Sequence, residues 1–481
     1  MRSTVLWLAA LSSCVSLSLA EETTAYKIHG QAWFEGGRIM QATDSLINGT
    51  APDNVLNLNG NITQSVGAQF TVQADLSENV TGAFGFGVIK VNHALGQGAG
   101  SLLAISLFQN FLTESRLTYF QGERSNPNFS FTLGNFSYKY NKDVKNLGLY
   151  LLRGPVYPGI LMGGFQDFAV DTTKSTQLGF QLHHKIGSFS QDLILNNERE
   201  VPPTLDWSLA YIAKFQAGPL EIGAGVNFYR LLAYDKKLET PGKYFSDADL
   251  QFKRDRYYDV DSVTKDTTFY THQGTKLMGM FGLDLQKLLG TELANPDDMK
   301  LYGEVGVIGI KNYGKAYDDI MKRIPAMLGF NIPTGGLLKH LSLEVEYYGA
   351  LYRNDLARVG NNNTVAPWTI QNHPIPSPKP VSYTDYGIDP VTGFWVRAEG
   401  DTVKVFGTAL DKGNQTKDNL KWSLLAEREI SKHISIMAQV ADDHYRPKSV
   451  ATGLIKAEGG TQEAFASPKD WYFMVRMGYF F

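Results

Sequence analysis

The sequence predicts an all-β protein, a transmembrane antiparallel β-barrel of about sixteen strands. Three observations predict it: a C-terminal strand with one apolar face, a series of segments with the same alternation, and connections that alternate between short and long. Beyond the N-terminus no apolar run reaches the roughly 18 residues that a transmembrane helix needs. The mean hydropathy of −0.20 is compatible with a barrel, in which lipid-facing and lumen-facing side chains average out.

The C-terminal strand is the clearest element. Its alternate residues are apolar over a length of about 10 residues, which suits a tilted strand that crosses a membrane. In this register Arg476 faces the lumen, and a shift by one residue would place it in lipid at a cost of about 2–4 kcal/mol. The alternative is an edge strand of a soluble sandwich. The residues of the apolar face are Trp471, Phe473, Val475, Met477, Tyr479 and Phe481.

Fifteen further segments alternate in the same way. Where Glu344 and Glu346 alternate with Leu343 and Val345, a soluble core would bury two carboxylates at high cost, whereas a watery lumen accepts them. The predicted strands are 26–35, 66–75, 82–91, 116–123, 129–139, 176–185, 189–196, 206–216, 220–230, 276–286, 300–311, 323–332, 341–353, 420–430 and 434–444, followed by the closing strand.

The connections predict the topology. Tight turns such as Gly218-Pro219 alternate with inserts such as 234–274 and 354–419, as periplasmic turns and outer loops do in membrane barrels. With an even strand number, both termini lie at the end that carries the short turns. Residues 101–112 are predicted to be a short helix or packed loop in the second outer loop, because one additional strand would make the number odd. A subunit-contact latch and a missed strand are the alternatives.

The N-terminus predicts export. Arg2, an apolar core and the small residues Ser18 and Ala20 indicate a signal peptide, residues 1–20, cut after Ala20. The barrel then occupies residues 21–481. The chain's single cysteine, Cys14, lies in the signal peptide, so no disulfide is expected in the mature protein. A lipid-attachment site at Cys14 is the alternative.

Several classes of chemistry have no support in the sequence. The net charge is −3 and no basic stripe is present, which argues against a nucleic-acid partner. No His/Cys cluster has metal-site spacing, and no phosphate-binding glycine loop appears. No nucleophile–base set can be assembled either. We therefore expect no enzyme activity, no metal and no cofactor.

The third outer loop, about 140–175, is long and unusually apolar for a solvated loop. A sixteen-strand barrel is too wide for its own side chains to fill, so this loop is predicted to fold into the lumen and narrow the bore. Alternatively it is a plug or packs on the surface. Its charged residues, the predicted constriction, are Lys142, Asp143, Lys145 and Arg153.

Charged residues are also predicted on the lumen wall. Acids outnumber bases there, and rings of carboxylates favour cations, so a weak cation preference is expected. The principal wall residues are Glu304, Glu344, Glu346, Lys421, Glu427 and Arg476; the others are Lys27, Asp192, Asp206, Lys214, Glu221 and Asp284.

Sixteen strands, a terminal Phe481 and a long third loop together resemble the general trimeric porins of bacterial outer membranes. No porin loop motif is matched, so individual residue roles are not transferred. The resemblance implies passive diffusion of small hydrophilic solutes or ions across the outer membrane of a Gram-negative bacterium. It also implies contact with outer-membrane lipid and lipopolysaccharide, insertion by the barrel-assembly machinery through the C-terminal strand, and a homotrimer. The rival hypothesis is a non-conducting barrel whose long outer loops bind a surface partner or polysaccharide. An outer-membrane enzyme is a third.

Overall fold

The computed structural model describes the barrel and parts of its connections. The residues described are 26–41, 45–47, 55–57, 60, 62–97, 101–146, 175–197, 207–232, 239–240, 252–253, 256–260, 267–271, 274–307, 310, 320–347, 387–388, 395–399, 402–406, 420–442 and 469–481. The predicted signal peptide, residues 1–20, lies outside them, as do Arg153 and Asp206.

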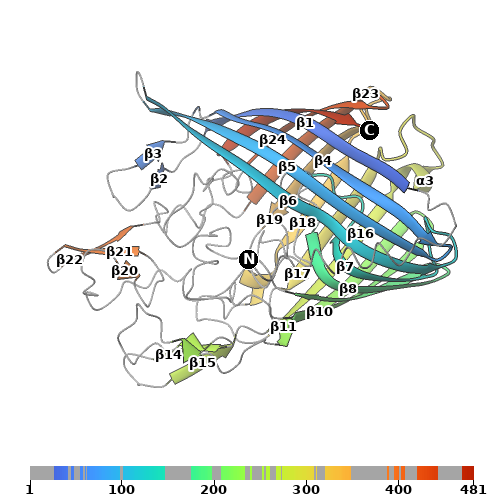
Figure 1. Ribbon diagram of the computed structural model, residues 1–481, viewed down its shortest axis with the longest axis horizontal. Coiled ribbons are helices and arrows are strands. Elements are labelled where there is room, and N and C mark those ends of the chain that lie inside the picture. Colours follow the sequence, from blue (N-terminus) through green and yellow to red (C-terminus); the bar gives the residue numbers. More distant parts are fainter. Residues whose placement is uncertain are drawn as a thin grey trace.

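Sixteen antiparallel strands form one closed barrel, and each of the sixteen predicted segments overlaps one of them (Figure 1). Each strand pairs with the barrel strands before and after it in sequence, and β1 pairs with β25 to close the ring. The predicted fold class is therefore confirmed. The strands are β1 (Tyr26–Gln41), β4 (Ile62–Ser77), β5 (Val80–Gln97), β6 (Ser101–Gln121), β7 (Phe129–Tyr138), β8 (Ser175–Ile186), β9 (Phe189–Asn197), β10 (Trp207–Ala217), β11 (Leu220–Leu232), β16 (Gly274–Asp284), β17 (Lys300–Val307), β18 (Ala326–Asn331), β19 (His340–Tyr347), β23 (Leu420–Ser431), β24 (Ile434–Ala441) and β25 (Trp471–Phe480).

Two-residue turns connect several pairs of strands at one end of the barrel. Gly187 and Gly218 open two-residue turns with φ of 57° and 58°, the left-handed conformation that tight hairpins favour. The connection between β16 and β17 starts with helix α3 (Leu285–Leu289), and the 3-10 helix η2 (Ile320–Arg323) precedes β18. The remaining short strands fall in other connections: β2 (Ser45–Ile47), β3 (Val55–Asn57), β12 (Glu239–Thr240), β13 (Phe252–Lys253), β14 (Arg256–Val260), β15 (Thr267–Thr271), β20 (Gly387–Ile388), β21 (Trp395–Glu399) and β22 (Thr402–Phe406).

Residues 101–112 correct the sequence-based expectation of a helix or packed loop. They are the first part of β6, which continues without interruption into the predicted strand 116–123. The register with β5 runs from Gln97↔Ser101 to Val80↔Tyr119, so the two strands form one long hairpin that projects beyond the rim (Figure 1). The periodicity of a short apolar run does not distinguish a helix from a strand. Here pairing with β5 satisfies the backbone hydrogen bonds of the segment. The strand number stays even because the segment adds length to β6 and no strand.

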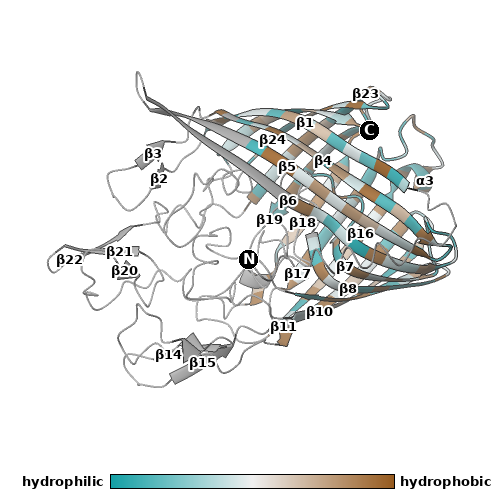
Figure 2. Cartoon of the chain, in the orientation of Figure 1, coloured by the Kyte–Doolittle hydropathy of each residue, from teal (hydrophilic) through white to brown (hydrophobic). Residues whose placement is uncertain are grey.

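The two faces of the wall differ in polarity. One outward row crosses eight neighbouring strands and is apolar throughout, whereas the adjacent inward row includes Glu221, Glu344 and Ser423. Figure 2 shows this alternation along the strands. An apolar belt around a polar interior is the arrangement of a transmembrane barrel. The outward row consists of Leu220, Leu283, Leu301, Phe330, Leu343, Leu424, Val440 and Phe473.

Among the described residues, no helix is both long and apolar enough to span a membrane.

The closing strand β25 is paired on both edges to its last residue. Gly30 and Phe481 exchange two backbone hydrogen bonds of 2.9 and 3.0 Å, and Phe480 N donates to His433 O at 2.7 Å. The Phe481 ring lies over Gly30, where a Cβ would come within 2.6 Å of Cζ of the ring. Glycine at this position therefore allows the terminal ring to pack against β1 on the outer face.

Candidate pore site

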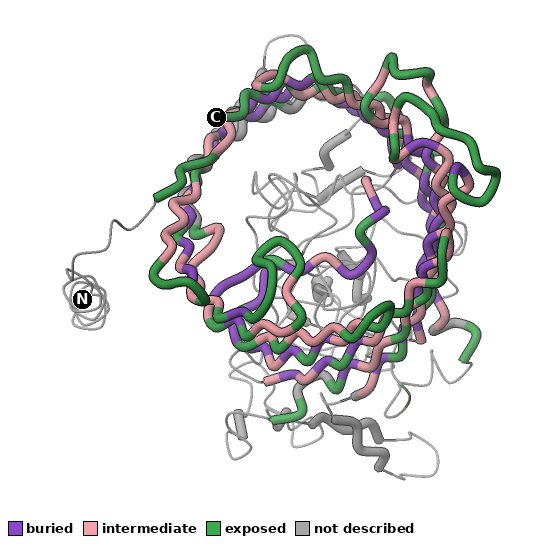
Figure 3. The backbone as a smooth tube through the Cα atoms, turned by 90° about the vertical axis from the view of Figure 1, so that its right-hand side faces the viewer, coloured by how far each residue is buried: buried purple, intermediate pink, exposed green. Residues whose placement is uncertain are grey.

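A segment of chain leaves β7 and runs inside the barrel. Residues 139–146 follow Tyr138 and contact wall strands from β10 to β23 on their inner faces. Figure 3, which looks along the barrel, shows a described piece of chain inside the ring of strands. We call residues 139–146 the inner segment. It is the described part of the predicted third outer loop; residues 147–174 lie outside the described residues, so the constriction as a whole stays a prediction.

The first half of the inner segment is held by two lysines. Lys214 Nζ, from β10, donates a hydrogen bond to Tyr140 O and lies 5.5 Å from the centre of the Tyr140 ring. Lys142 Nζ forms an ion pair with Glu221, which is next to the short turn between β10 and β11. Both contacts therefore lie near the ends of β10 and β11 that meet in the short turn.

The next residue packs tightly on β16. Asp143 lies over Gly282, where a Cβ would come within 2.7 Å of Asp143 Oδ2. Asp143 Oδ1 is also 3.7 Å from Lys300 Nζ on β17. Glycine at position 282 thus provides the space that this carboxylate occupies. Gly282 was not predicted from the sequence, although an inward glycine within a strand signals close approach of another chain segment.

Backbone and side-chain hydrogen bonds hold the far end of the inner segment. The Lys145 backbone N–H donates to Glu344 Oε1 at 2.7 Å, and Tyr302 OH donates to the same oxygen at 2.6 Å. Asn146 Nδ2 donates to Ser423 O at 2.9 Å, while Ser342 Oγ donates to Asn146 Oδ1 at 3.3 Å. Glu344, fully buried, is therefore a docking point for the segment.

Asp297 links the inner segment to the connection between β16 and β17. Its carboxylate pairs with Lys145 Nζ at 3.1 Å and also with Lys300 Nζ. Burial alone raises the pKa of Asp297, but the hydrogen bonds and charges of the two lysines outweigh burial and hold its pKa well below its usual value. The carboxylate is therefore ionised throughout the neutral range.

Another buried ion pair lies across the seam between β25 and β1. Arg476 donates from Nε and Nη2 to Glu35 Oε2 at 2.9 and 2.6 Å, and its guanidinium lies 5.8 Å from the Trp33 ring centre. Ser65 Oγ donates to Glu35 Oε1 at 3.4 Å. β25 thus places Arg476 on the inner face, as the sequence-based register requires.

A third polar cluster surrounds Asp192 on β9. Asp192 accepts hydrogen bonds from Tyr138 OH at 2.9 Å and from Gln181 Nε2 at 3.1 Å, and His183 Nδ1 lies 2.8 Å from its Oδ1. His184, on the other face of the strand, contacts Gln191 instead. Asp192 was predicted on the lumen wall from the sequence, but its hydrogen-bond partners were not.

The structure places the predicted wall residues on one face. Glu304, Glu344, Glu346 and Lys421 are buried on inward positions, and Glu427 lies 3.5 Å from Lys339. At the C-terminal end the exposed residues include Phe473, Val475, Met477, Tyr479 and Phe481 of the predicted apolar face, and also Phe480. The structure therefore brings Lys145 to Glu344, whereas Lys142 pairs with Glu221 and Asp143 lies near Lys300. Arg476 pairs instead with Glu35.

Within the described residues, no group of three or more His, Cys, Asp and Glu side chains could hold a metal ion.

Comparison with known proteins gives a fold-level likeness only. No protein-family model matches the sequence, and no curated protein does. Three solved structures align over nearly the whole length: OprB of Pseudomonas putida (9% identity, 99% of this chain and 97% of that one, TM-score 0.42), OmpF of Salmonella typhi with daunomycin (9%, 96% and 99%, 0.41) and OmpT of Vibrio cholerae (8%, 96% and 99%, 0.38). Strand number and pairing, rather than these low scores, define the architecture. It is a closed antiparallel barrel of sixteen strands.

Proposed function

We propose that this protein is an outer-membrane channel through which small hydrophilic solutes or ions diffuse passively. One observation carries the proposal: a closed ring of sixteen strands has an apolar outer belt and a polar, charged inner face. A ring of this size is too wide to be filled by its own side chains. Polar groups such as Glu344 and Arg476 are costly inside a membrane unless they face water or partners.

The inner segment lies inside the barrel, and this position supports the proposal that the bore is narrowed. It carries Lys142, whose side chain is 63% exposed, although Lys142 also pairs with Glu221. Most of the described charges near it are paired, which weakens the net field in the bore. A weak cation preference is therefore proposed, since acids outnumber bases on the wall.

Single-channel recording in planar bilayers tests the proposal. We expect discrete conductance steps, and a higher step size when residues 144–158 are deleted, because the deletion removes part of the inner segment and of the predicted constriction. Liposome swelling with small sugars gives a second readout. Correctly folded protein that supports neither current nor swelling would favour a non-conducting barrel whose outer loops bind a surface partner or polysaccharide.

The remaining proposals concern the setting of the channel. Export with a cleaved signal peptide, a Gram-negative source, contact with lipopolysaccharide, insertion by the barrel-assembly machinery and a homotrimer are all proposed from the porin-like pattern. Triplet steps in single-channel traces would support the trimer. No enzymatic activity is proposed.

A further inference from the structure

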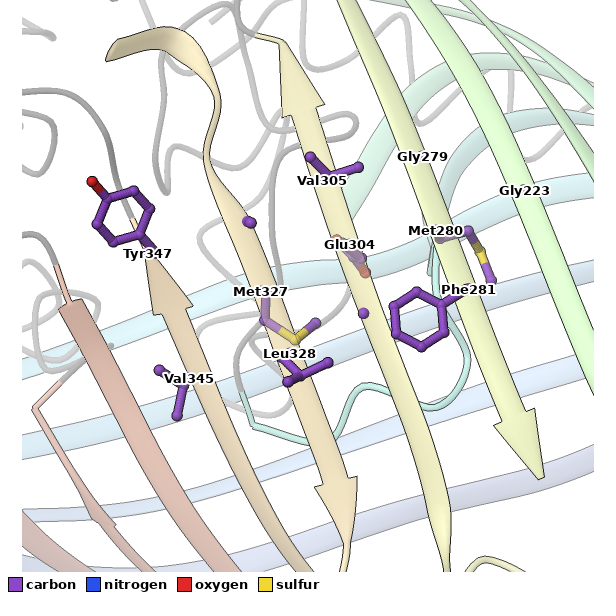
Figure 4. Close-up of a pocket in the computed structure, with 12 residues that line it drawn as sticks. Gly223, Gly279, Met280, Phe281, Glu304, Val305, Met327, Leu328, Val345 and Tyr347 are labelled. Carbon is purple, nitrogen blue, oxygen red and sulfur yellow. The ribbon is translucent and has the colours of Figure 1, made fainter. Parts of the chain in front are cut away.

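An apolar groove lies on the lipid-facing side of strands β16 to β19. It forms an open cavity of about 710 Å³, and Figure 4 shows the side chains that line it. The groove is on the outer wall because most of its lining residues, such as Gly279, Val305 and Leu328, occupy outward positions. Met280, Glu304 and Met327 also line it, but their side chains are buried on the inward side of the same strands.

Small residues form the floor of the groove. Gly279, Gly303 and Ala326 occupy outward positions on three successive strands. At Gly303 the Phe281 ring already covers the backbone, since a Cβ would come within 2.6 Å of Phe281 Cε1 and 2.8 Å of Met327 O, so only glycine fits there. The depression therefore lies beside the Phe281 ring, where Gly279 and Ala326 present nothing larger than a methyl group.

Larger residues form the rims. Val305, Leu328 and Tyr347 are 45%, 53% and 50% exposed, and Phe281 and Val345 are half-buried beside them. Among the lining residues only Tyr347 and Glu304 carry polar side-chain groups, and the Glu304 side chain occupies a buried, inward position. A ligand that fills the groove must therefore be almost wholly apolar.

The position of the groove identifies its occupant. Its rims continue the apolar belt of the barrel, since Leu283, Leu301, Phe330 and Leu343 form the adjacent outward row on the same four strands. This belt faces the hydrocarbon of the bilayer. Two copies of this groove facing each other would leave both depressions unfilled, because two concave surfaces cannot interlock. Contact with a different surface of a second copy is an outcome of the test below.

We propose that this groove is a binding site for the acyl chain of a membrane lipid. A hydrocarbon chain is flexible enough to follow the floor formed by the glycines and to contact both rims. The driving force is close packing, because the belt is already surrounded by apolar lipid. The site does not depend on conduction through the barrel.

Photolabelling tests the site. The full-length protein is folded into phosphatidylcholine vesicles with a trace of phosphatidylcholine that carries a diazirine on one acyl chain, and labelled peptides are mapped by mass spectrometry. We expect labelling to concentrate on 279–281, 303–305 and 326–328. Ala326→Leu fills the floor and removes several carbon–carbon contacts between the groove and the acyl chain. We therefore expect the excess of labelling at the groove over the rest of the belt to fall roughly fivefold. Leu328→Ala, at an exposed rim, also lowers it.

Ala68→Leu is the matched control, since Ala68 is an outward residue of β4 far from the groove in strand order and its substitution should leave groove labelling unchanged. Heat-modifiable migration on gels verifies that each variant is folded. Labelling spread evenly around the belt, and unaffected by Ala326→Leu, would overturn the proposal. So would dimers cross-linked through Leu328→Cys with the groove unlabelled, which would assign the surface to a second copy of the chain.

Discussion

Arg476 and Glu35 form a buried ion pair across the seam between β25 and β1. Glu35 is 3% exposed, and the Arg476 side chain is 13% exposed. Removing one member of such a pair leaves a buried charge without its principal counter-charge, which costs more than the intact pair contributes.

Arg476→Met is therefore expected to destabilise the folded barrel by about 3 kcal/mol. Urea unfolding in phosphatidylcholine vesicles, followed by tryptophan fluorescence, measures the change. Arg428→Met, at an exposed position of β23, is the control and should have little effect. The double variant Arg476→Met with Glu35→Leu should recover most of the loss, and a double variant as unstable as Arg476→Met would contradict this explanation.

The lowered pKa of Asp297 predicts that the attachment of the inner segment is sensitive to acid. The pKa of Asp297 is lowered in the folded protein, so its pairing stabilises the fold above the unfolded-state pKa, about 4, and this stabilisation is lost as pH falls through the folded-state pKa. We expect channel noise to rise below about pH 4 in the parent protein. Asp297→Asn should show the noisier behaviour already at pH 7 and little further change on acidification. Single-channel traces between pH 7 and pH 3 measure it.

At the scale of elements, the inner segment depends on contacts with strands that are distant in sequence. Lys142 pairs with Glu221, and Lys145 pairs with Asp297. Neither ion pair could be predicted from the spacing of residues in the sequence, because its two members are far apart along the chain. The sequence indicated which residues are charged and that the loop is long, but not which wall strands it contacts.

Neutralising both lysines tests their role in ion selectivity. Lys142→Gln with Lys145→Gln leaves the carboxylates of Glu221 and Asp297 without these partners, and an unpaired carboxylate attracts a cation by about 1 kcal/mol at 4 Å in water. We expect the cation-to-anion permeability ratio to rise, by up to roughly fivefold at low salt. Reversal potentials in a salt gradient measure it. Lys432→Gln, at an exposed position of the turn between β23 and β24, is the control; an unchanged potential in the double variant would mean that these lysines do not face the permeation path.

The extension of β6 illustrates a limit at the same scale. Residues 101–112 have the apolar composition of a helix or a packed loop, and only pairing with β5 makes them a strand. Gly282 is a second example of this limit, because the reason for a glycine there is seen only when the structure places Asp143 over it.

At the scale of the whole molecule, the barrel closes between residues near the two ends of the chain. Ala32 is the partner of Tyr479, and Phe481 exchanges hydrogen bonds with Gly30. Closure leaves no edge strand within the barrel, which is the condition for a sheet to span a membrane.

A disulfide across the seam tests this register. The only cysteine of the chain is Cys14, so Ala32→Cys with Tyr479→Cys places two new thiols on directly opposed outward positions. We expect efficient oxidation to an intramolecular disulfide, seen as faster migration of denatured protein on non-reducing gels. Ala32→Cys with Gly478→Cys is the control, because residue 478 points to the other face. Equal oxidation of both variants would contradict the register.

The sequence by itself determined the barrel class, the strand number, the face of each clear strand and the inward position of Arg476. These properties are local, because alternation along one strand already separates lipid from lumen. Only the tertiary structure decided the length of β6, the path of the inner segment, the partners of Glu344 and Asp297, and the groove outside β16 to β19. Each of these depends on contacts between distant parts of the chain, and on which neighbour lies opposite a small residue, which no single strand encodes.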